Sequence, residues 1–484
     1  MNTRKVRPYL VLAICCLSLL MVSLDVTIVN VALPAIRRDL DASTSGLQWV
    51  IDAYTMVVAS LLMLAGSLAD RFGRRRTFQI GLSTFTVASV LCSLAPSLQA
   101  LVAFRMLQAV GASMLNPVAM SIITNTFTEP KARARAIGAW GAVVGVSMAL
   151  GPLVGGGLTQ LVGWRSIFWI NLPIGVGAIA LAQAFVPESK APRARRPDPL
   201  GQLLVLGTLV AVTYAVIEGP HHGWGSPVIA ALFAVAICGV GAIIAYEPRR
   251  NEPLLDLRFF RSVPFSSATL IAVLAFGTFA GFLFLNALYL QEVRGLPPFA
   301  TGVYTLPLAL ATIVCSPISG WLIGKSGTRV PLVLAGTAIG TSALMLTQLD
   351  ARTPLAWIVA SYVVFGVGFG LVNAPITNTA VSGMPNASAG VAAAIASTSR
   401  QVGASLGVAI GGTIAQSRGG EFAHAMRTFY LLSACGGGII VLLGIVSNSA
   451  WGKATLRRAA VLIAQGDAPG AAVPVAANAT VTAR

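Results

Sequence analysis

Long apolar runs recur along this chain from near the N-terminus almost to Trp451. Each is close to the about 20 residues that a helix needs to cross the hydrocarbon core of a bilayer. Only 10% of the residues are charged and 56% are hydrophobic, whereas a soluble domain carries about 25% charged residues. Strands of a membrane barrel alternate polar and apolar residues, and these runs do not alternate. Because lipid cannot satisfy open backbone groups, the sequence predicts an all-α membrane protein.

The runs divide into fourteen candidate membrane spans, arranged as six, two and six. The candidates lie at about 9–35, 47–69, 78–96, 99–123, 135–160 and 166–186, then 200–219 and 227–246, then 265–290, 300–324, 330–349, 355–379, 388–415 and 428–448. We expect a six-helix bundle over 1–187, two linker helices with flanking cytoplasmic loops over 188–263, and a second six-helix bundle over 264–450. Residues 451–484 are predicted to form a disordered cytoplasmic tail.

Basic residues outnumber acidic ones by 33 to 16, which gives a net charge of +17. In a soluble protein this charge would suggest nucleic acid as a partner. Here the basic residues gather in alternate connections, such as Arg71–Arg76, Lys131–Arg135 and Lys190–Arg196. This asymmetry is typical of cytoplasmic loops. It predicts a multi-pass inner-membrane protein with both termini in the cytoplasm and no nucleic-acid partner.

A basic loop motif occurs twice, as GSLADRFGRRR at Gly66–Arg76 and as GWLIGKSGTR at Gly320–Arg329. Two halves related by an axis along the membrane normal produce such a repeat. In the first copy a glycine at the helix end allows a neighbouring helix to approach. Asp70 can hold an arginine or a helix N-terminus. The predicted cytoplasmic gating motif comprises Gly66, Asp70, Arg71, Gly73, Arg74 and Arg75.

Two ionisable residues, Asp25 and Arg105, are predicted to lie inside the membrane. A carboxylate at this depth costs about 2.5–3.5 kcal/mol on insertion scales, and apolar surroundings favour its neutral form. Asp25 is therefore a candidate for proton exchange, unless it is a polar residue near an outer interface. Arg105 cannot lose its proton and needs a partner. Asp25 is the first candidate and a substrate site the second, while snorkelling to the interface is the alternative.

Asp52 lies one helical turn after Trp49 on the second span. This extra carboxylate suits the binding of a cation, or it caps a polar face. Glu218 ends the seventh span, where we expect it to be interfacial and exposed. The residues predicted to line a substrate cavity are Asp25, Asn30, Asp52, Tyr54, Asn116, Asn286, Tyr289 and Asn373.

The fifth span is rich in glycine at small-xxx-small spacing. Its motif residues are Gly141, Gly145, Gly151, Pro152, Gly155 and Gly156. The proline removes a backbone hydrogen bond and kinks the helix. A kinked, grooved helix can pack against a helix of the second half, although ordinary tight packing would need the same residues.

Catalytic and metal-binding patterns are not visible in the sequence. The six cysteines all fall in apolar runs without a CxxC pair, which favours small apolar core residues over a zinc site. His221 and His222 form a pair that we expect to be a solvated loop feature. We therefore predict no metal, no cofactor and no enzymatic activity.

Seven stretches resemble motifs of the major facilitator superfamily, in particular its fourteen-helix drug:proton antiporter branch. They are Leu24–Pro34, Trp49–Tyr54, Gly66–Arg76, Arg105–Gly111, Gly141–Gly156, Trp164–Pro173 and Arg400–Gly403. The resemblance implies the major facilitator fold with 14 transmembrane helices, as two six-helix bundles plus two inserted linker helices. It also implies proton coupling through Asp25 and Arg105, and antiport from the Gly141–Gly156 motif.

The function implied by this resemblance is multidrug efflux. We expect a monomer in the lipid bilayer that uses the proton motive force to export drugs, antibiotics or other small amphipathic compounds by alternating access. The alternatives are a proton-coupled uptake symporter and an exporter of one specific endogenous metabolite.

Overall fold

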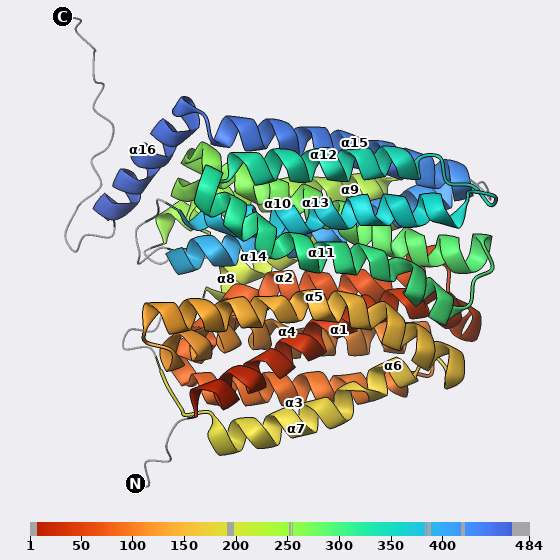
Figure 1. The fold of residues 1–484 in the computed structure, drawn as a ribbon, viewed down its shortest axis with the longest axis horizontal. Coiled ribbons are helices and arrows are strands. Elements are labelled where there is room, and N and C mark those ends of the chain that lie inside the picture. The colour runs from red at the N-terminus through yellow and green to blue at the C-terminus, as the bar shows by residue number, and fades with distance from the viewer. Residues whose placement is uncertain are drawn as a thin grey trace, which may run out of the picture.

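The computed structural model describes residues 7–190, 198–250, 253, 255–382, 384, 389–417 and 422–466. These residues form long helices that run side by side along one axis (Figure 1), and no strand occurs among them. The first group comprises α1 (Pro8–Leu40), α2 (Thr44–Phe72), α3 (Arg74–Ser93), α4 (Leu98–Thr126), α5 (Pro130–Leu161), α6 (Ser166–Trp169) and α7 (Asn171–Phe185).

The second part of the chain begins with the pair α8 (Pro199–His222) and α9 (Pro227–Tyr246), followed by the short 3-10 helices η1 (Glu247–Arg249) and η2 (Leu257–Arg261). The second group then comprises α10 (Val263–Leu288) with the π-helical turn η3 (Tyr289–Val293), α11 (Pro298–Ser326), α12 (Arg329–Leu346), α13 (Leu355–Val381), α14 (Ala389–Ser417), α15 (Phe422–Ser447) and α16 (Ala450–Gly466).

Short polar caps and glycines set the helix ends. Ser43 begins α2 by accepting the backbone N–H of Gly46 at 3.1 Å, and Ser97 begins α4 in the same way. These side chains satisfy donors that the first turn of a helix leaves free. Between α2 and α3 the chain turns at Gly73, whose φ of +116° few other residues adopt without strain. The predicted span at 166–186 is broken into α6 and α7 at Ile170.

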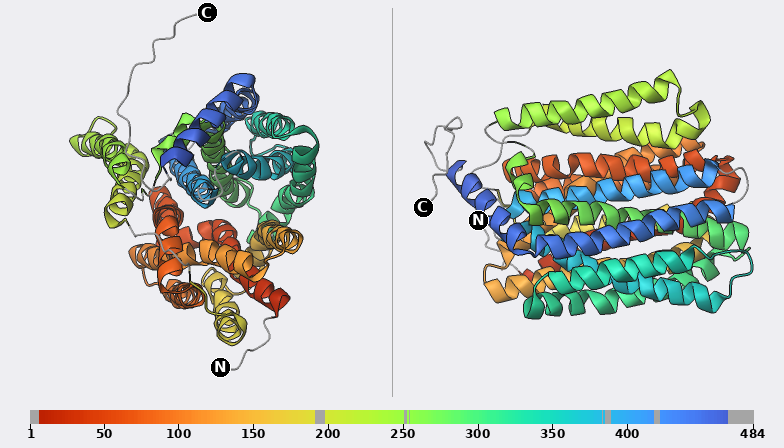
Figure 2. Two further views of the ribbon diagram at one scale, coloured as in Figure 1. Left: turned by 90° about the vertical axis from the view of Figure 1, so that its left-hand side faces the viewer. Right: turned by 90° about the horizontal axis from the view of Figure 1, so that it is seen from above.

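Helices of each group pack mainly on one another. In the first group α1 packs on α5, and α4 packs between α2 and α3. In the second group α10 packs on α14, α11 on α13, and α12 on α15. The groups meet along α5 and α11, along α2 and α14, and more briefly along α1 and α10. Seen along the helix axes, they form two neighbouring bundles (Figure 2).

The helices α8 and α9 form a pair of their own. They pack on each other, and α8 also contacts α2 and α14 at the junction of the two groups. Figure 2 shows the pair on the outside of the bundles. Thr413 on α14 donates to the carbonyl of Val216 on α8 at 2.7 Å.

Twelve helical segments within the described residues are long and apolar enough to cross a membrane. Two further long helices, α3 and α14, lie within the bundles but do not reach this apolar composition. The first turn of α3 holds Arg74–Arg76, and α14 carries Arg400 and Gln401 at its centre. Each packs on two other helices, α3 on α4 and α7, and α14 on α10 and α2, while Ile80 and Val87 of α3 remain exposed.

The predicted disordered tail is wrong for residues 451–466, which belong to α16. Its small and apolar residues recur at helical spacing on one face, which buries Gly452, Ala459 and Ile463. That helix packs on α10 and η2, and the Thr455 hydroxyl accepts the backbone N–H of Val263 at 3.0 Å. The rest of the predicted tail, 467–484, lies outside the described residues. Both α16 and the start of α1 lie at one end of the bundles (Figure 1), which we call the α16 end.

Candidate functional site

A buried ion pair joins α1 and α4 inside the first group. Arg105 Nη1 lies 2.5 Å from Asp25 Oδ2, and the side chains are 2% and 0% exposed. Asp25 is thus the partner of Arg105, as predicted, and neither side chain reaches an interface with solvent. A buried pair is held together strongly only when its remaining donors and acceptors are also satisfied.

Neutral side chains complete the carboxylate's shell. Gln108, one turn after the arginine on α4, donates to Asp25 Oδ1 at 2.9 Å. Asn171, the first residue of α7, donates to the same oxygen at 3.3 Å and to Ser89 on α3 at 3.0 Å. Three helices, α1, α4 and α7, therefore converge on one carboxyl group, and Ser89 connects α3 to it through Asn171. Gln108 and Asn171 were not predicted as site residues, although both lie in the motifs that carry the family resemblance.

The guanidinium is held as fully as the carboxylate. Arg105 Nη1 also donates to Gln108 Oε1 at 2.8 Å, and its Nε donates to the carbonyl of Val50 at 3.3 Å. Its central carbon lies 4.2 Å from the ring centroid of Tyr54 on α2, a cation–π contact. Protonating Asp25 would cancel the charge that balances Arg105, so uptake of one proton there changes what holds α1, α2 and α4 together.

Asp52 occupies a different place, where α2 meets α14 of the second group. Its side chain is fully buried and faces the hydroxyls of Thr55 and Ser405, but neither carboxyl oxygen makes a hydrogen bond of good geometry. One turn earlier, Gln48 donates to the carbonyl of Ala409 on α14 at 2.7 Å. A Cβ added at Gly412 would lie 2.3 Å from the Gln48 side chain. The α2–α14 contact is thus tight, and it encloses a carboxyl group with no ion-pair partner among the described residues.

The glycines of α5 allow backbone contacts with α1 and α11. Cβ atoms added at Gly151 and Gly155 would lie within 2.5 Å of Thr27 and Ile28 on α1. A Cβ added at Gly156 would lie 2.4 Å from the carbonyl oxygen of Pro298, at the start of α11. Pro152 is approached in the same way, because a Cβ on Gly302 of α11 would lie 2.2 Å from its carbonyl oxygen.

The close contacts between α5 and α11 become fewer toward the α16 end. Gly145 still faces Ile313 on α11, but Cβ atoms added at Gly141 on α5 or at Gly320 and Gly324 on α11 would meet no described atom within 4 Å. The two groups thus fit together away from the α16 end.

Polar contacts close the same distal end. Arg37 Nη1 at the end of α1 lies 2.7 Å from Glu292 Oε2 in η3, and Gln291 donates to the carbonyl of Val31 at 2.8 Å. Both contacts join the first group to the second.

The loop motif at the α16 end is held within the first group. Asp70 Oδ1 lies 3.0 Å from Arg74 Nη2, so the expected arginine partner comes from the motif itself. The N-terminus of α3 is taken by Glu188 instead, which accepts the backbone N–H groups of Arg75 and Arg76 at 3.0 and 3.2 Å. A carboxylate at a helix N-terminus is favoured by the helix dipole. Gly66 meets no described side chain within 4 Å of an added Cβ, and Arg71 lies over the ring of Phe72.

The remaining predicted cavity residues do not gather around Asp25. Asn30 donates to the carbonyl of Val26 on its own helix at 2.9 Å, and the carbonyl oxygen of the Asn116 side chain is buried without a partner. In the second group, Asn286 accepts from the hydroxyl of Tyr362. Tyr289 donates to the carbonyl of Asp350 at 2.6 Å, which ties it to a turn at the distal end, and Asn373 is half-buried on α13.

Glu218 was predicted to be exposed, and this prediction is wrong. It is partly buried and accepts the indole N–H of Trp49 at 3.1 Å, because α8 packs on α2. Its neighbour His221 contacts Ser45 and Gln416. In the part of the chain that the structure describes, no cluster of three or more His, Cys, Asp or Glu residues has the geometry to hold a metal ion.

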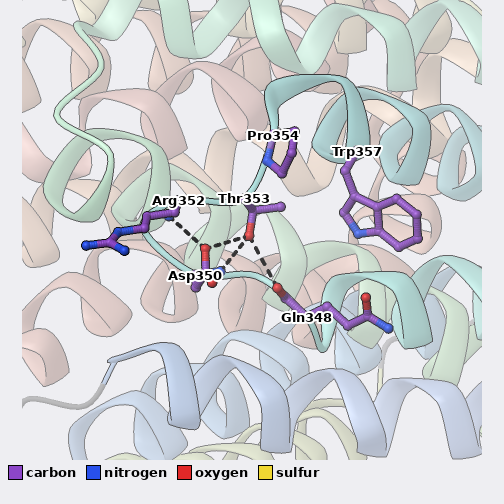
Figure 3. A pocket seen from close by; sticks show the side chains of 6 residues that line it. All are labelled: Gln348, Asp350, Arg352, Thr353, Pro354 and Trp357. Carbon is purple, nitrogen blue, oxygen red and sulfur yellow. Dashed lines mark hydrogen bonds between the residues drawn. The ribbon is translucent and has the colours of Figure 1, made fainter.

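A surface pocket of about 300 Å³ lies in the connection between α12 and α13 (Figure 3). Its polar residues stabilise a turn: Asp350 accepts the backbone N–H of Arg352 at 2.7 Å and the hydroxyl of Thr353 at 2.9 Å. Both hydrogen bonds lower the pKa of Asp350, and the one from Arg352 has the larger effect. The pocket is remote in the fold from the Asp25 cluster, and it holds none of the predicted site residues.

Comparison with known proteins places the chain in a family. Residues 15–408 match the model of the Major Facilitator Superfamily. The chain therefore belongs to the major facilitator superfamily, and its two helical groups have that fold.

Several relatives carry names that state a role. The multidrug resistance protein Stp of Mycobacterium tuberculosis is 38% identical over 82% of this chain and 74% of its own length. The tetracenomycin C resistance and export protein of Streptomyces glaucescens is 37% identical over 86% and 77% of the two chains. The methylenomycin A resistance protein of Streptomyces coelicolor is 35% identical over 89% of each. By its family and its apolar helices, the chain is a multi-pass membrane transporter and not an enzyme.

Proposed function

We propose that this transporter is a proton-driven antiporter that exports drugs, antibiotics or other small amphipathic compounds across the inner membrane. Relatives that cover most of the chain are named for multidrug resistance and for resistance to or export of single antibiotics. The observation that carries the proposal is the buried pair of Asp25 and Arg105, since a transporter coupled to protons needs a group that can be protonated within the membrane.

The orientation follows from the basic loops. Positive-inside asymmetry assigns the α16 end to the cytoplasm, together with both termini. The contacts between Arg37 and Glu292, between Gln48 and α14, and between Gly156 and α11 then close the outer side. In this proposal the structure represents the state that receives substrate from the cytoplasm. Rocking of one bundle against the other opens the outer side in turn.

Proton coupling is proposed to act through the charge of Asp25. With the carboxylate charged, Arg105 is balanced and α1, α2, α4 and α7 are held around it. A proton entering from outside neutralises the carboxyl group and releases the guanidinium, which changes the relative stability of the two states. Inward movement of one charge gains about 2.3 kcal/mol per 100 mV. Export is coupled to this proton movement if binding of the proton and binding of the substrate stabilise opposite conformational states of the transporter.

The proposed membrane topology has fourteen spans, with α3 and α14 added to the twelve segments that are apolar enough by themselves. Both helices pack alongside other membrane helices. The proposed domains are two bundles of six spans, at 1–187 and 264–450, with the linker pair between them. The proposed transporter acts as a monomer, with the proton motive force in place of a cofactor.

A narrow substrate range is a second candidate, favoured by the relatives named for tetracenomycin C and methylenomycin A. Everted membrane vesicles from cells overproducing the chain test the proposal and this alternative together. Adding an exported drug to energised vesicles should release protons from the lumen, and a panel of drugs should show how many are accepted. Proton uptake into the lumen on substrate addition would indicate symport and would refute the proposal.

A further inference from the structure

Arg400 lies in the second group, deep within α14. The residue is about 16 Å along the helix from Ala389, at about 1.5 Å per residue. This depth places a permanent positive charge within the apolar core, because arginine does not lose its proton in proteins.

The contacts of Arg400 are all neutral. Its Nη2 donates to the hydroxyl of Thr377 on α13 at 2.5 Å, and its Nη1 donates to Ser397 at 3.4 Å. The guanidinium carbon lies 5.7 Å from the ring centroid of Phe276 on α10. Its Nε is buried without a partner. No carboxylate of the described residues forms an ion pair with it.

The sequence shows that the second group has almost no anion to offer. No Asp or Glu occurs between Glu292 and Asp350, or between Asp350 and Glu421. Both Glu292 and Asp350 lie at the distal end, where they are engaged with Arg37 and with the α12–α13 turn. Arg105 in the first group has a carboxylate within 2.5 Å, so the chain does pair a buried arginine elsewhere.

Aromatic rings adjoin the unpaired cation. Phe276 contacts Phe369 with ring centroids 5.1 Å apart, and Phe279 stacks on Phe369 at 4.2 Å. Both Phe276 and Phe279 remain partly exposed, whereas Phe369 is buried. A cation beside a partly exposed aromatic wall matches a ligand that is anionic at one end and aromatic at the other.

We propose that Arg400, Thr377, Ser397 and Phe276 form a binding site for the carboxylate or other acidic group of an amphipathic aromatic substrate. The guanidinium provides a planar fork that can hold two anionic oxygens, and its Nε is free to donate. The two hydroxyls can turn to donate to the anion. This site deepens the proposed export function, on which it rests, by assigning acidic aromatic compounds as one substrate class.

The placement of the site connects it to the conformational change. Arg400 is on α14 and Phe276 on α10, the helices of the second group that contact α2 and α1 of the first. An anion bound there lies next to the surface along which the bundles move, and it supplies the charge that the second group lacks.

Binding to the purified full-length protein in detergent tests the site. Two anionic aromatic probes, fluorescein and 1-naphthoate, are compared with the cation ethidium. The variants are Arg400→Gln, Arg400→Lys and Thr377→Val, with Arg457→Gln on the exposed face of α16 as the matched control. Arg400→Gln should weaken binding of both anions by about 10-fold or more, because the variant loses the charge-assisted hydrogen bonds of the guanidinium. Ethidium binding should stay within about 2-fold, and Arg400→Lys should keep part of the anion binding.

The outcomes separate the site from the proposed function. Absence of anion binding by the unmodified protein, unchanged anion binding by Arg400→Gln, or an equal loss of anions and ethidium would overturn the site. If Arg400→Gln does not fold, Thr377→Val must weaken anion binding selectively, or the site is refuted. Failure of the proposed export function would instead be seen in the vesicle assay, where the unmodified protein would move no drug. The binding assay on purified protein can still succeed in that case, so the two failures are distinguishable.

Discussion

Breaking the Asp25–Arg105 pair should destabilise the protein more than removing both partners. Asp25→Leu leaves the guanidinium with Gln108, the Val50 carbonyl and the Tyr54 ring, but without a counter-ion. Removing one partner of a buried ion pair typically costs about 3–5 kcal/mol. A neutral hydrogen bond between membrane helices contributes only about 0.6 kcal/mol on average. The charge therefore dominates the expected loss.

The two single substitutions should differ in their response to pH. Asp25→Leu leaves an arginine that stays charged at any accessible pH. Arg105→Met leaves a carboxyl group that can take up a proton, so its cost should fall as the pH is lowered. The double variant Asp25→Leu/Arg105→Met removes both buried charges and should be more stable than either single variant. We expect a coupling energy of at least about 3 kcal/mol between the two positions.

Equilibrium unfolding in mixed micelles, with a rising fraction of denaturing detergent, provides the assay. The 8 tryptophans of the chain report the transition by their fluorescence. Asp39→Asn is the matched control, because the Asp39–Arg165 pair is 47% and 41% exposed and should contribute no more than about 1 kcal/mol. Additive costs of the two substitutions, or a double variant less stable than both singles, would refute the reasoning.

Three further substitutions test the packing between and within the bundles. Gly302→Ala should open the distal end, because the added Cβ would lie 2.2 Å from a backbone oxygen of α5. The opening should be measured as faster thiol labelling of cysteines introduced at that end. Gly141→Ala, which has open space around it, is the control, and equal labelling rates in the two variants would contradict the packing argument. Arg37→Gln should lower the unfolding free energy by no more than about 1 kcal/mol, since the Arg37 side chain is 28% exposed, and a larger loss in the micelle assay would contradict this limit. Gly73→Ala should lower the melting temperature of the purified protein, because the residue has a φ of +116° and its Cβ would lie 2.7 Å from Glu188; an unchanged melting temperature would contradict that reading.

Residue chemistry alone was sufficient to predict the central pair. An arginine within an apolar run needs a partner, and few acids occur inside the membrane spans, so Asp25 was the natural candidate for Arg105. The neutral residues of the same shell were not predicted, because glutamine and asparagine are common in helices and only the packing of α4 and α7 around Asp25 of α1 gives Gln108 and Asn171 their role.

Long-range contacts account for the other differences. Glu188 lies far along the chain from the α3 N-terminus that it caps, so the loop motif by itself suggested Asp70 for such a role. The helix α16 was missed because its apolar residues are few and are separated in the sequence by basic residues. Glu218 was expected to be exposed because nothing in the sequence shows that α8 packs on α2. Helix existence was predicted well because continuous apolar runs leave few alternatives in lipid.

Transport by Asp25→Asn in proteoliposomes tests the coupling mechanism most directly. Liposomes with the unmodified protein and a fixed pH difference should accumulate an exported drug above its external concentration, and collapsing the pH difference and the voltage should abolish this. Asp25→Asn should still equilibrate the drug down its own gradient but should not accumulate it. Uphill accumulation by Asp25→Asn at the unmodified rate would contradict the assignment of this carboxyl group as the proton carrier.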